Sequence, residues 1–379
     1  MKITGIICEY NPFHIGHAKQ IAAIRAKEPD SAIVCLMSGN YVQRGMPAVF
    51  DKAVRAKAAI LCGADLVLEL PVTAALSSAE GFAFQGVQIL SGFCDTLSFG
   101  AETADADLLL DTARVLLTED FSDQLKKFLI LGVSFPAARQ KALESMGLDA
   151  AALTKPNNIL AVEYCKAILS QNSQMKPEPI HRMGDYHDSA PDLENPSASS
   201  LRLMIENRDN WHPFVPNSLV SLFENAPVHT LHAGEKAILY RLRTMTDEEF
   251  EALPYGSEGL WRKLMKNART CGSLEQILTA TKSKRYTRTR LDRMVMCAYL
   301  GLSAKKLASP APYCRVLALN DTGRTVLSKA RESGVFPNLG EKLEHPYQVI
   351  ENHSDDLYRL FQTSTEECLS RQTLYYHSN

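Results

Sequence analysis

The chain has 379 residues, too many for one ordinary hydrophobic core, so we expect two domains. Its composition, with 22% charged residues and a formal net charge of −2, excludes a highly charged disordered chain but not a local basic patch. No apolar run reaches the ~20 residues of a membrane span and no secretory signal precedes the first strand pattern, so we expect a cytoplasmic protein without a membrane or obligate protein partner.

The first seventeen residues predict a nucleotide site where a strand meets a helix. Residues 3–8 are typical of a buried parallel strand, residues 11–12 supply a turn, and a helical pattern then begins at His14. His14 and His17 share one face of that helix, and Gly16 between them has no side chain to block a ligand. Together with the helix N-terminus, these candidate catalytic histidines would hold a triphosphate and stabilise charge at its α-phosphate. The alternative is a pair that merely caps a helix; the preceding strand and turn favour the phosphate site.

Three further apolar runs alternate with helical patterns. They cover residues 32–37, 65–71 and 96–99, and predict an α/β fold with a doubly wound parallel sheet. Gly100 follows the fourth strand, at the edge where such sheets bind ligands. It either lets a base or ribose approach the backbone or simply forms a turn.

Residues 104–153 have helical patterns and form an insertion in this order. Asn157 then lies in a polar turn before the next helix, where its amide either caps the helix or hydrogen-bonds adenine or ribose. Residues 179–183 predict an edge strand in which Arg182 is a candidate phosphate or base contact. A polar loop follows at residues 184–188.

A second candidate phosphate site precedes a helix predicted to begin at residue 201. Ser199 and Ser200 offer hydroxyl groups there, and Arg202 follows them closely. A serine N-cap is the simpler explanation, but the upstream histidines favour a grip on the β- and γ-phosphates. The proline-rich stretch 211–216 then marks a joint, so we place the domain boundary between residues 1–215 and residues 216–379.

The second domain has mainly helical patterns to about residue 307, and a strand-helix pattern at 315–330 that predicts a small α/β appendage. Residues 282–293 hold six basic side chains and one acidic side chain. Such a run is usually a solvated helix end. Here the interleaved threonines and Tyr286, which could stack on an unpaired base, favour contact with nucleic-acid phosphates.

The chain offers no enzyme nucleophile. Cys8 and Ser38 lack a recognisable base partner, and the nine cysteines form no zinc-like cluster, so we expect no protein metal site. Direct attack of a bound substrate on the α-phosphate of ATP is the simpler proposal, and it would convert a carboxylate into a mixed anhydride. We expect Mg²⁺ with the triphosphate, held mainly by phosphate oxygens.

The stretch His14-Ile15-Gly16-His17 resembles the HIGH motif of the nucleotidyltransferase and class I synthetase superfamily. Residues 5–17 as a whole are similar to one branch, the bacterial tRNA(Met) cytidine acetate ligases. Similar stretches follow in order along nearly the whole chain, at residues 37–45, 69–71, 99–102, 155–160, 185–188, 197–202 and 285–288. The resemblance implies a nucleotidyltransferase-like Rossmann domain followed by a mainly helical, tRNA-binding domain.

Such ligases use ATP and acetate to make acetyl-adenylate, and then acetylate N4 of the wobble cytidine, position 34, of elongator tRNA(Met). The resemblance implies that ATP contacts Ile7, Cys8, Glu9, Tyr10, Asn11, Pro12, Phe13, His14, Ile15, Gly16, His17, Ala18, Lys19, Gln20, Gly100, Asn157 and Arg182, in addition to Ser199, Ser200 and Arg202. The expected tRNA-binding residues are Lys282, Lys284, Arg285, Tyr286, Arg288, Arg290 and Arg293. Ser200 stands where the superfamily often has Thr, and Ile15 where it commonly has Asn; neither change removes a group that the site uses.

Other functions fit parts of the pattern. A nucleotidyltransferase that joins AMP to a phosphorylated small molecule would leave the basic second domain unused. A non-catalytic RNA-binding protein would have no need of intact His14, Gly16 and His17. A class I aminoacyl synthetase is disfavoured, because residues 282–284 only faintly match the second motif of that group.

Overall fold

The computed structural model describes residues 1–150, 153–182, 197–309, 313–332, 337–338, 346–364 and 375–377. At its centre is a sheet in the order β10-β8-β5-β2-β1-β6-β7, with β9 (Pro337–Asn338) beside β8. The strands from β5 to β7 in this order all run parallel to one another. They are β5 (Leu66–Leu70), β2 (Ala32–Ser38), β1 (Ile3–Cys8), β6 (Thr96–Ala101) and β7 (Lys176–His181). The predicted parallel α/β sheet is confirmed, and the carboxyl ends of these strands share one edge.

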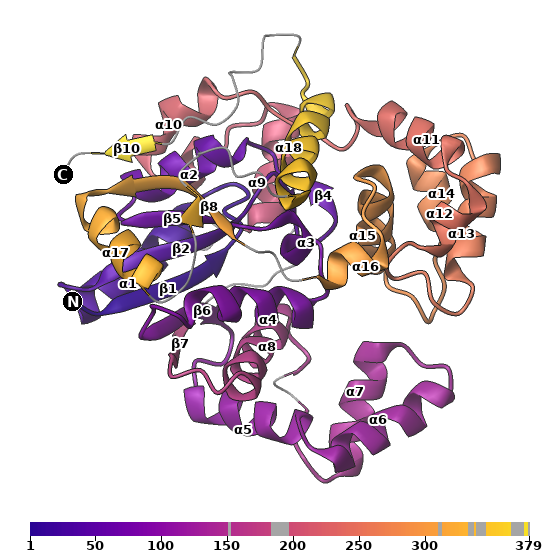
Figure 1. Cartoon of the computed structure of the whole chain (residues 1–379), viewed down its shortest axis with the longest axis horizontal. Coiled ribbons are helices and arrows are strands. Elements are labelled where there is room, and N and C mark those ends of the chain that lie inside the picture. The colour runs from indigo at the N-terminus through magenta and orange to yellow at the C-terminus, as the bar shows by residue number, and fades with distance from the viewer. Residues whose placement is uncertain are drawn as a thin grey trace.

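Helices cover both faces of the sheet (Figure 1). One face packs against α4 (Ala79–Leu90), α8 (Pro156–Ser170) and α17 (Asp321–Glu332). The other packs against α1 (Ile15–Lys27), α2 (Lys52–Leu61), α9 (Ala198–Asn207) and α10 (Asn217–Glu224). Ile7 belongs to the first core and Ile6 to the second. Burial on both faces explains why the strands are continuous apolar runs.

Two helical regions adjoin the sheet. Between β6 and α8 come α5 (Ala106–Leu116), α6 (Glu119–Ile130) and α7 (Phe135–Ser145), which form the lobe at the bottom of Figure 1 and lie within the expected insertion. The region on the right contains α11 (Glu235–Thr244), α12 (Asp247–Glu251), α13 (Leu260–Thr270), α14 (Leu274–Thr281), α15 (Arg288–Tyr299) and α16 (Ala304–Ala308). No helix among the described residues is long and apolar enough to cross a lipid bilayer.

The strand and helix predicted near residues 315–330 join the main sheet: the strand pairs within it and the helix packs on its face. β8 (Cys314–Asn320) pairs antiparallel with β5 and parallel with β10 (Tyr375–His377). The predicted strand and helix are present, but they do not form a small appendage: β8 is buried throughout and covers the edge of β5 that would otherwise be left unpaired. The domain boundary at residue 215 stays a prediction. β8 and α17 follow this boundary in the sequence but pack with the sheet that precedes it.

A buried charge cluster fastens β8 and α18 (Pro346–Tyr358) to the sheet. Arg315 of β8 donates to Glu69 of β5 at 2.6 Å, and to Glu351 and Asp355 of α18 at 3.0 and 3.1 Å. Lys52 of α2 donates to Glu69 at 2.9 Å and to Asp355 at 2.7 Å. Burial raises the pKa of Glu351 to about 7, against the opposing effect of Arg315. The cluster ties together segments from both ends of the chain.

Candidate active site

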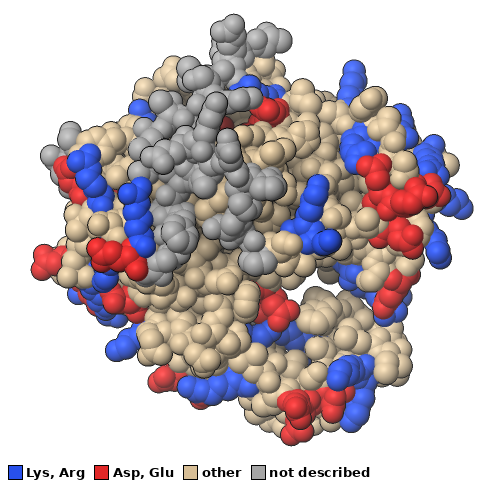
Figure 2. All heavy atoms as spheres, in the orientation of Figure 1, with Lys and Arg blue, Asp and Glu red and all other residues tan. Residues whose placement is uncertain are grey.

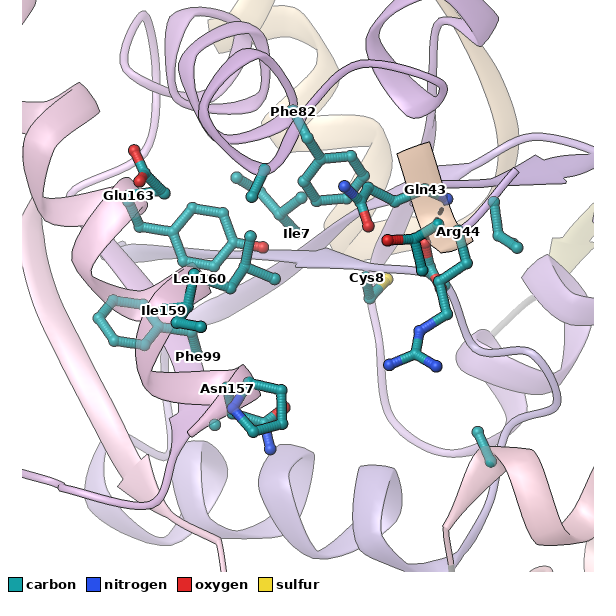
Figure 3. A pocket seen from close by; sticks show the side chains of 18 of the residues that line it. Ile7, Cys8, Gln43, Arg44, Phe82, Phe99, Asn157, Ile159, Leu160 and Glu163 are labelled. Atoms are coloured by element: carbon teal, nitrogen blue, oxygen red, sulfur yellow. Dashed lines mark hydrogen bonds between the residues drawn. The ribbon is translucent and has the colours of Figure 1, made fainter. Parts of the chain in front are cut away.

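A cavity of about 950 Å³ lies at the carboxyl ends of β1, β6 and β7. Its walls come from the start of α1, from α7 and α8, from residues 42–46, and from residues between 285 and 293. Figure 2 shows a hollow between the insertion lobe and the helical region, with Lys and Arg side chains near its rim. In Figure 3, Gln43 and Arg44 lie across the cavity from Asn157 and Leu160. The cavity thus lies at the ligand-binding edge expected for such a sheet.

His14 and His17 form a capping box at the start of α1. The Nδ1 of His14 accepts a hydrogen bond from the N–H of Gly16 (3.1 Å), and the Nδ1 of His17 accepts one from the N–H of His14 (3.2 Å). The two rings stack with centroids 3.7 Å apart. Because each Nδ1 is an acceptor, a neutral ring carries its proton on Nε2. The histidines do cap the helix, and in doing so they present two Nε2–H donors.

The surroundings keep these rings neutral and favour an anion. Burial, followed by the charges of Arg182 and Arg202, lowers the pKa of His14 to about 3. Burial and the neighbouring His14 hold the pKa of His17 well below its usual value. The Nε2 of His14 is buried and has no hydrogen-bond partner among the described residues. An orphan donor beside two fixed positive charges is matched to a phosphate oxygen.

Two glycines near the histidines have different roles. A Cβ on Gly16 would lie 2.9 Å from Cε1 of His14, so the glycine makes room for the capping ring. Gly16 also lines the cavity, and its contact with a ligand stays a prediction. A Cβ on Gly100 would meet nothing closer than Arg182, at 3.9 Å, so Gly100 leaves an open surface within the cavity lining.

Asn157 is oriented from both sides. Its Nδ2 donates to Glu102 at 2.8 Å, and Arg182 donates to its Oδ1 at 3.4 Å. Glu102 also accepts from the backbone N–H of Asn158 at 2.8 Å, so this glutamate caps α8. In the sequence, Glu102 is marked only as part of the similar stretch 99–102, and this capping role has no local signal there. The asparagine is thereby fixed against the cavity, which it lines together with Arg182.

The serine-rich start of α9 positions an arginine. Ser197 is the N-cap and accepts from the N–H of Ser200 at 3.1 Å; Ser200 Oγ donates back to the Ser197 carbonyl at 2.9 Å. Ser199 Oγ accepts from Arg202 at 3.0 Å, and Arg202 also donates to the carbonyl of Asn11 at 2.7 Å. Arg202 lines the cavity, whereas Ser199 and Ser200 do not. Direct phosphate contact by these serines stays a prediction.

The other residues expected to bind ATP divide into two groups. Those that line the cavity are Ile7, Cys8, Glu9, Tyr10, Asn11, Lys19 and Gln20. Those outside its lining are Pro12, Phe13, Ile15 and Ala18. Sequence reasoning missed an apolar wall made by Phe82, Phe99, Leu160 and Tyr164. No local motif could mark this wall, because its members come from α4, β6 and α8.

Arg55 of α2 fastens the loops beneath the cavity. It is completely buried and donates to the carbonyls of Glu9 at 2.6 Å and Ser38 at 3.1 Å, which joins the ends of β1 and β2. The hairpin of β3 (Tyr41–Val42) and β4 (Met46–Pro47) follows. Gly45 in its turn has φ +79°, and a Cβ there would lie 2.3 Å from the backbone nitrogen of Arg293. The hairpin therefore docks closely on α15.

The basic run adjoins the same cavity, but part of its charge is paired. Arg285 forms an ion pair with Glu258 at 2.6 Å, and Arg288 forms one with Glu275 at 2.7 Å. These acids come from other segments, so the local charge excess is smaller than the run alone indicates. The cavity lining includes Arg285, Arg290 and Arg293, and excludes Lys282, Lys284, Tyr286 and Arg288. Their contact with tRNA stays a prediction.

Two further points concern the polar loop predicted at residues 184–188 and protein ligands for a metal ion. The loop 184–188, with the similar stretch 185–188, lies outside the described residues. Among the residues that the structure does describe, no group of three or more His, Cys, Asp or Glu side chains is arranged to hold a metal ion.

Comparisons with known proteins place the chain in a family. The family model "HIGH Nucleotidyl Transferase" matches residues 1–372. A tRNA(Met) cytidine acetate ligase of Clostridium perfringens is 35% identical over 364 residues, 90% of each chain, and one of Anoxybacillus flavithermus is 34% identical over 378 residues, 94% of each chain. The crystal structure of Thermotoga maritima TmcAL bound with alpha-thio ATP matches with a TM-score of 0.87 and 28% identity over 100% of both chains. The chain is therefore a member of the HIGH nucleotidyl transferase family and, within it, of the tRNA(Met) cytidine acetate ligases.

Proposed function

We propose that this protein activates acetate with ATP as acetyl-adenylate and transfers the acetyl group to N4 of the wobble cytidine of elongator tRNA(Met), in the cytoplasm. The observation that carries the proposal is the buried Nε2 of His14, which has no hydrogen-bond partner within the described part of the chain and lies beside Arg182 and Arg202 at the carboxyl end of β1. The names of the relatives and the nucleotide in the Thermotoga maritima structure support the same activity.

The geometry fits attack of acetate on the α-phosphate. Neutral His14 and His17 donate through Nε2 to phosphate oxygens, while Arg182 and Arg202 balance charge that develops as pyrophosphate leaves. Asn157 and Gly100 border the space for the nucleoside. These groups position and neutralise the reactants, so no covalent enzyme intermediate is needed.

Mg²⁺ fits this site as a companion of the triphosphate. The described residues offer no cluster of protein ligands for a resident metal ion, and Mg²⁺ in nucleotide sites keeps water and phosphate oxygens as ligands. When bound, the ion would supply charge neutralisation on the phosphates. The chain's own contribution is the fixed donors around His14.

The RNA approaches from the helical region in this proposal. Arg285, Arg290 and Arg293 lie in the cavity lining, and exposed Lys282 and Lys284 extend the basic surface outward. Phosphate contacts would hold the anticodon loop while one unpaired cytidine enters the cavity.

The test is acetate-dependent exchange of labelled pyrophosphate into ATP, followed by incubation with labelled acetate and total tRNA and mapping of the label. We expect exchange with acetate alone and label on cytidine 34 of elongator tRNA(Met). Exchange that requires a phosphorylated metabolite would instead identify a small-molecule nucleotidyltransferase. RNA binding without any exchange would identify a non-catalytic RNA-binding protein.

A further inference from the structure

The cavity contains one acidic side chain that the adenylation step does not use. Of the carboxylates in its described lining, Glu163 pairs with Arg139 at 2.7 Å and Glu80 pairs with Lys166 at 2.8 Å. Glu9 also lines the cavity and forms no ion pair among the described residues. Its Oε1 accepts one hydrogen bond, from the backbone N–H of Gln43 at 2.8 Å.

A carboxylate in this place is poorly suited to the phosphates of ATP. Phosphate oxygens are anionic acceptors, and a carboxylate near them repels them and has no proton to donate. By contrast, the Nε2–H groups of the histidine pair and the guanidinium groups of Arg182 and Arg202 are donors. Glu9 therefore suits a ligand that brings N–H donors of its own.

The position of Glu9 connects the two halves of the site. It directly follows β1, on the way to His14, and its backbone carbonyl accepts a hydrogen bond from Arg55 at 2.6 Å. The residue that fixes its carboxylate, Gln43, also uses its carbonyl oxygen to accept a hydrogen bond from Arg293 at 3.3 Å. Arg293 belongs to the basic run, so Glu9 lies between the phosphate grip and the surface proposed for RNA.

We propose that Glu9 is a catalytic residue of acetyl transfer, whose carboxylate accepts a hydrogen bond from the N4 amino group of the target cytosine and takes up its proton. This inference rests on the proposed function. A glutamate is a suitable acceptor for the N4 amino group of cytosine. The apolar part of the same cavity lining, with Phe99, Leu160 and Tyr164, offers surface for the base.

In the transfer step, the N4 nitrogen attacks the acetyl carbonyl carbon and a C–N bond forms. The C–O bond to the phosphate breaks, and AMP leaves with the electron pair. The N4 proton passes to the Glu9 carboxylate and from there to water, which yields N4-acetylcytidine and AMP.

The experiment compares two rates in the full-length protein and the variant Glu9→Gln. The amide oxygen of Gln can still accept from the Gln43 N–H, but it cannot take a proton at neutral pH. We measure acetate-dependent ATP–pyrophosphate exchange, and single-turnover transfer from labelled acetyl-adenylate to a transcript of elongator tRNA(Met). The ratio of transfer to exchange should fall about 10²–10⁴-fold in Glu9→Gln. In Glu9→Asp, which retains a carboxylate, the ratio should recover in part.

Glu80→Gln is the matched control, because it changes a cavity carboxylate that is exposed and paired with Lys166. The inference is overturned if Glu9→Gln leaves the ratio of transfer to exchange unchanged, which includes the case in which both rates fall together. If added Mg²⁺ restores both rates, Glu9 is a cation ligand and the inference is likewise overturned. If the unmodified protein shows no acetate-dependent exchange, the proposed function itself fails, which is a separate result.

Discussion

Arg202 lies 2.7 Å from the backbone oxygen of Asn11 and joins the start of α9 to the turn that precedes the histidine pair. The two residues are 191 positions apart in the sequence. A second hydrogen bond, to Ser199 at 3.0 Å, fixes the guanidinium from the other side. Part of the positive charge at the proposed ATP site thus depends on contact between distant segments.

Arg202→Met should weaken ATP binding because it removes this charge without removing the bulk. Hydrogen bonds to charged groups contribute about 1.5–3 kcal/mol, so the KM for ATP should rise about 10–100-fold in the exchange assay. Arg208→Ala, at the exposed end of the same helix, is the control and should leave KM unchanged. Equal KM values in both variants would remove Arg202 from the phosphate site.

His14→Asn separates helix capping from catalysis. Asn is a good N-cap residue and can accept from the Gly16 N–H, but it lacks the Nε2–H donor. We expect urea stability within about 1 kcal/mol of the parent, and exchange about 10²–10³-fold slower. Normal exchange in this variant would mean that the pair serves only the helix.

The depressed pKa of His14 also predicts how stability depends on pH. The unfolded chain protonates this residue near its usual pKa of 6.5, and the folded chain only near about 3. Between these values the unfolded state binds more protons, so acidification destabilises the fold by up to about 1.4 kcal/mol per pH unit from this group. In urea titrations below about pH 6, His14→Asn should lose stability less steeply than the parent. Parallel curves would show that His14 titrates equally in both states.

Arg315→Met tests the buried charge cluster. The variant leaves Glu69, Glu351 and Asp355 with only Lys52 as a cation in the cluster. Removal of one partner from a buried ion pair costs about 3–5 kcal/mol, so the urea midpoint should fall strongly. Arg331→Met, at the exposed end of α17, should change it little. A stable Arg315→Met variant would mean that the carboxylates bind protons at little cost.

The basic run should divide into functional and structural members. Combined Lys282→Ala and Lys284→Ala should reduce the slope of log affinity for tRNA against log salt by about 1.4–1.8, because each lysine lost removes one phosphate contact. Arg288→Ala should change the slope less, since Glu275 already pairs with that guanidinium at 2.7 Å. Filter binding between low and moderate salt measures both, and an unchanged slope in the double variant would exclude these lysines.

Local sequence patterns are sufficient to predict much of the fold and the histidine pair of the candidate site. Periodicity was sufficient for β1, β2, β5 and β6, because each is short, apolar and followed by a turn. It was insufficient for β8, whose pattern identifies a strand but not its partner. Pairing with β5 depends on a free sheet edge that only the assembled structure reveals.

In the candidate site, too, the sequence predicts some features, and others appear only in the assembled structure. The spacing of His14 and His17 predicts a phosphate grip, but it does not show that their Nδ1 atoms are used for capping. Charges in the basic run were visible in the sequence, whereas the acids that neutralise them, such as Glu258, come from other segments. Contacts between residues far apart in the chain leave no local signal.

The antiparallel β8 has a consequence for biosynthesis. A nascent chain released or truncated at residue 215 would already contain Lys52 and Glu69, but not the Arg315 that covers Glu69 or the Asp355 that engages Lys52. The catalytic half should therefore remain immature until the carboxyl-terminal segment has left the ribosome. The two halves are better regarded as one cooperative folding unit than as modules that could be exchanged between proteins.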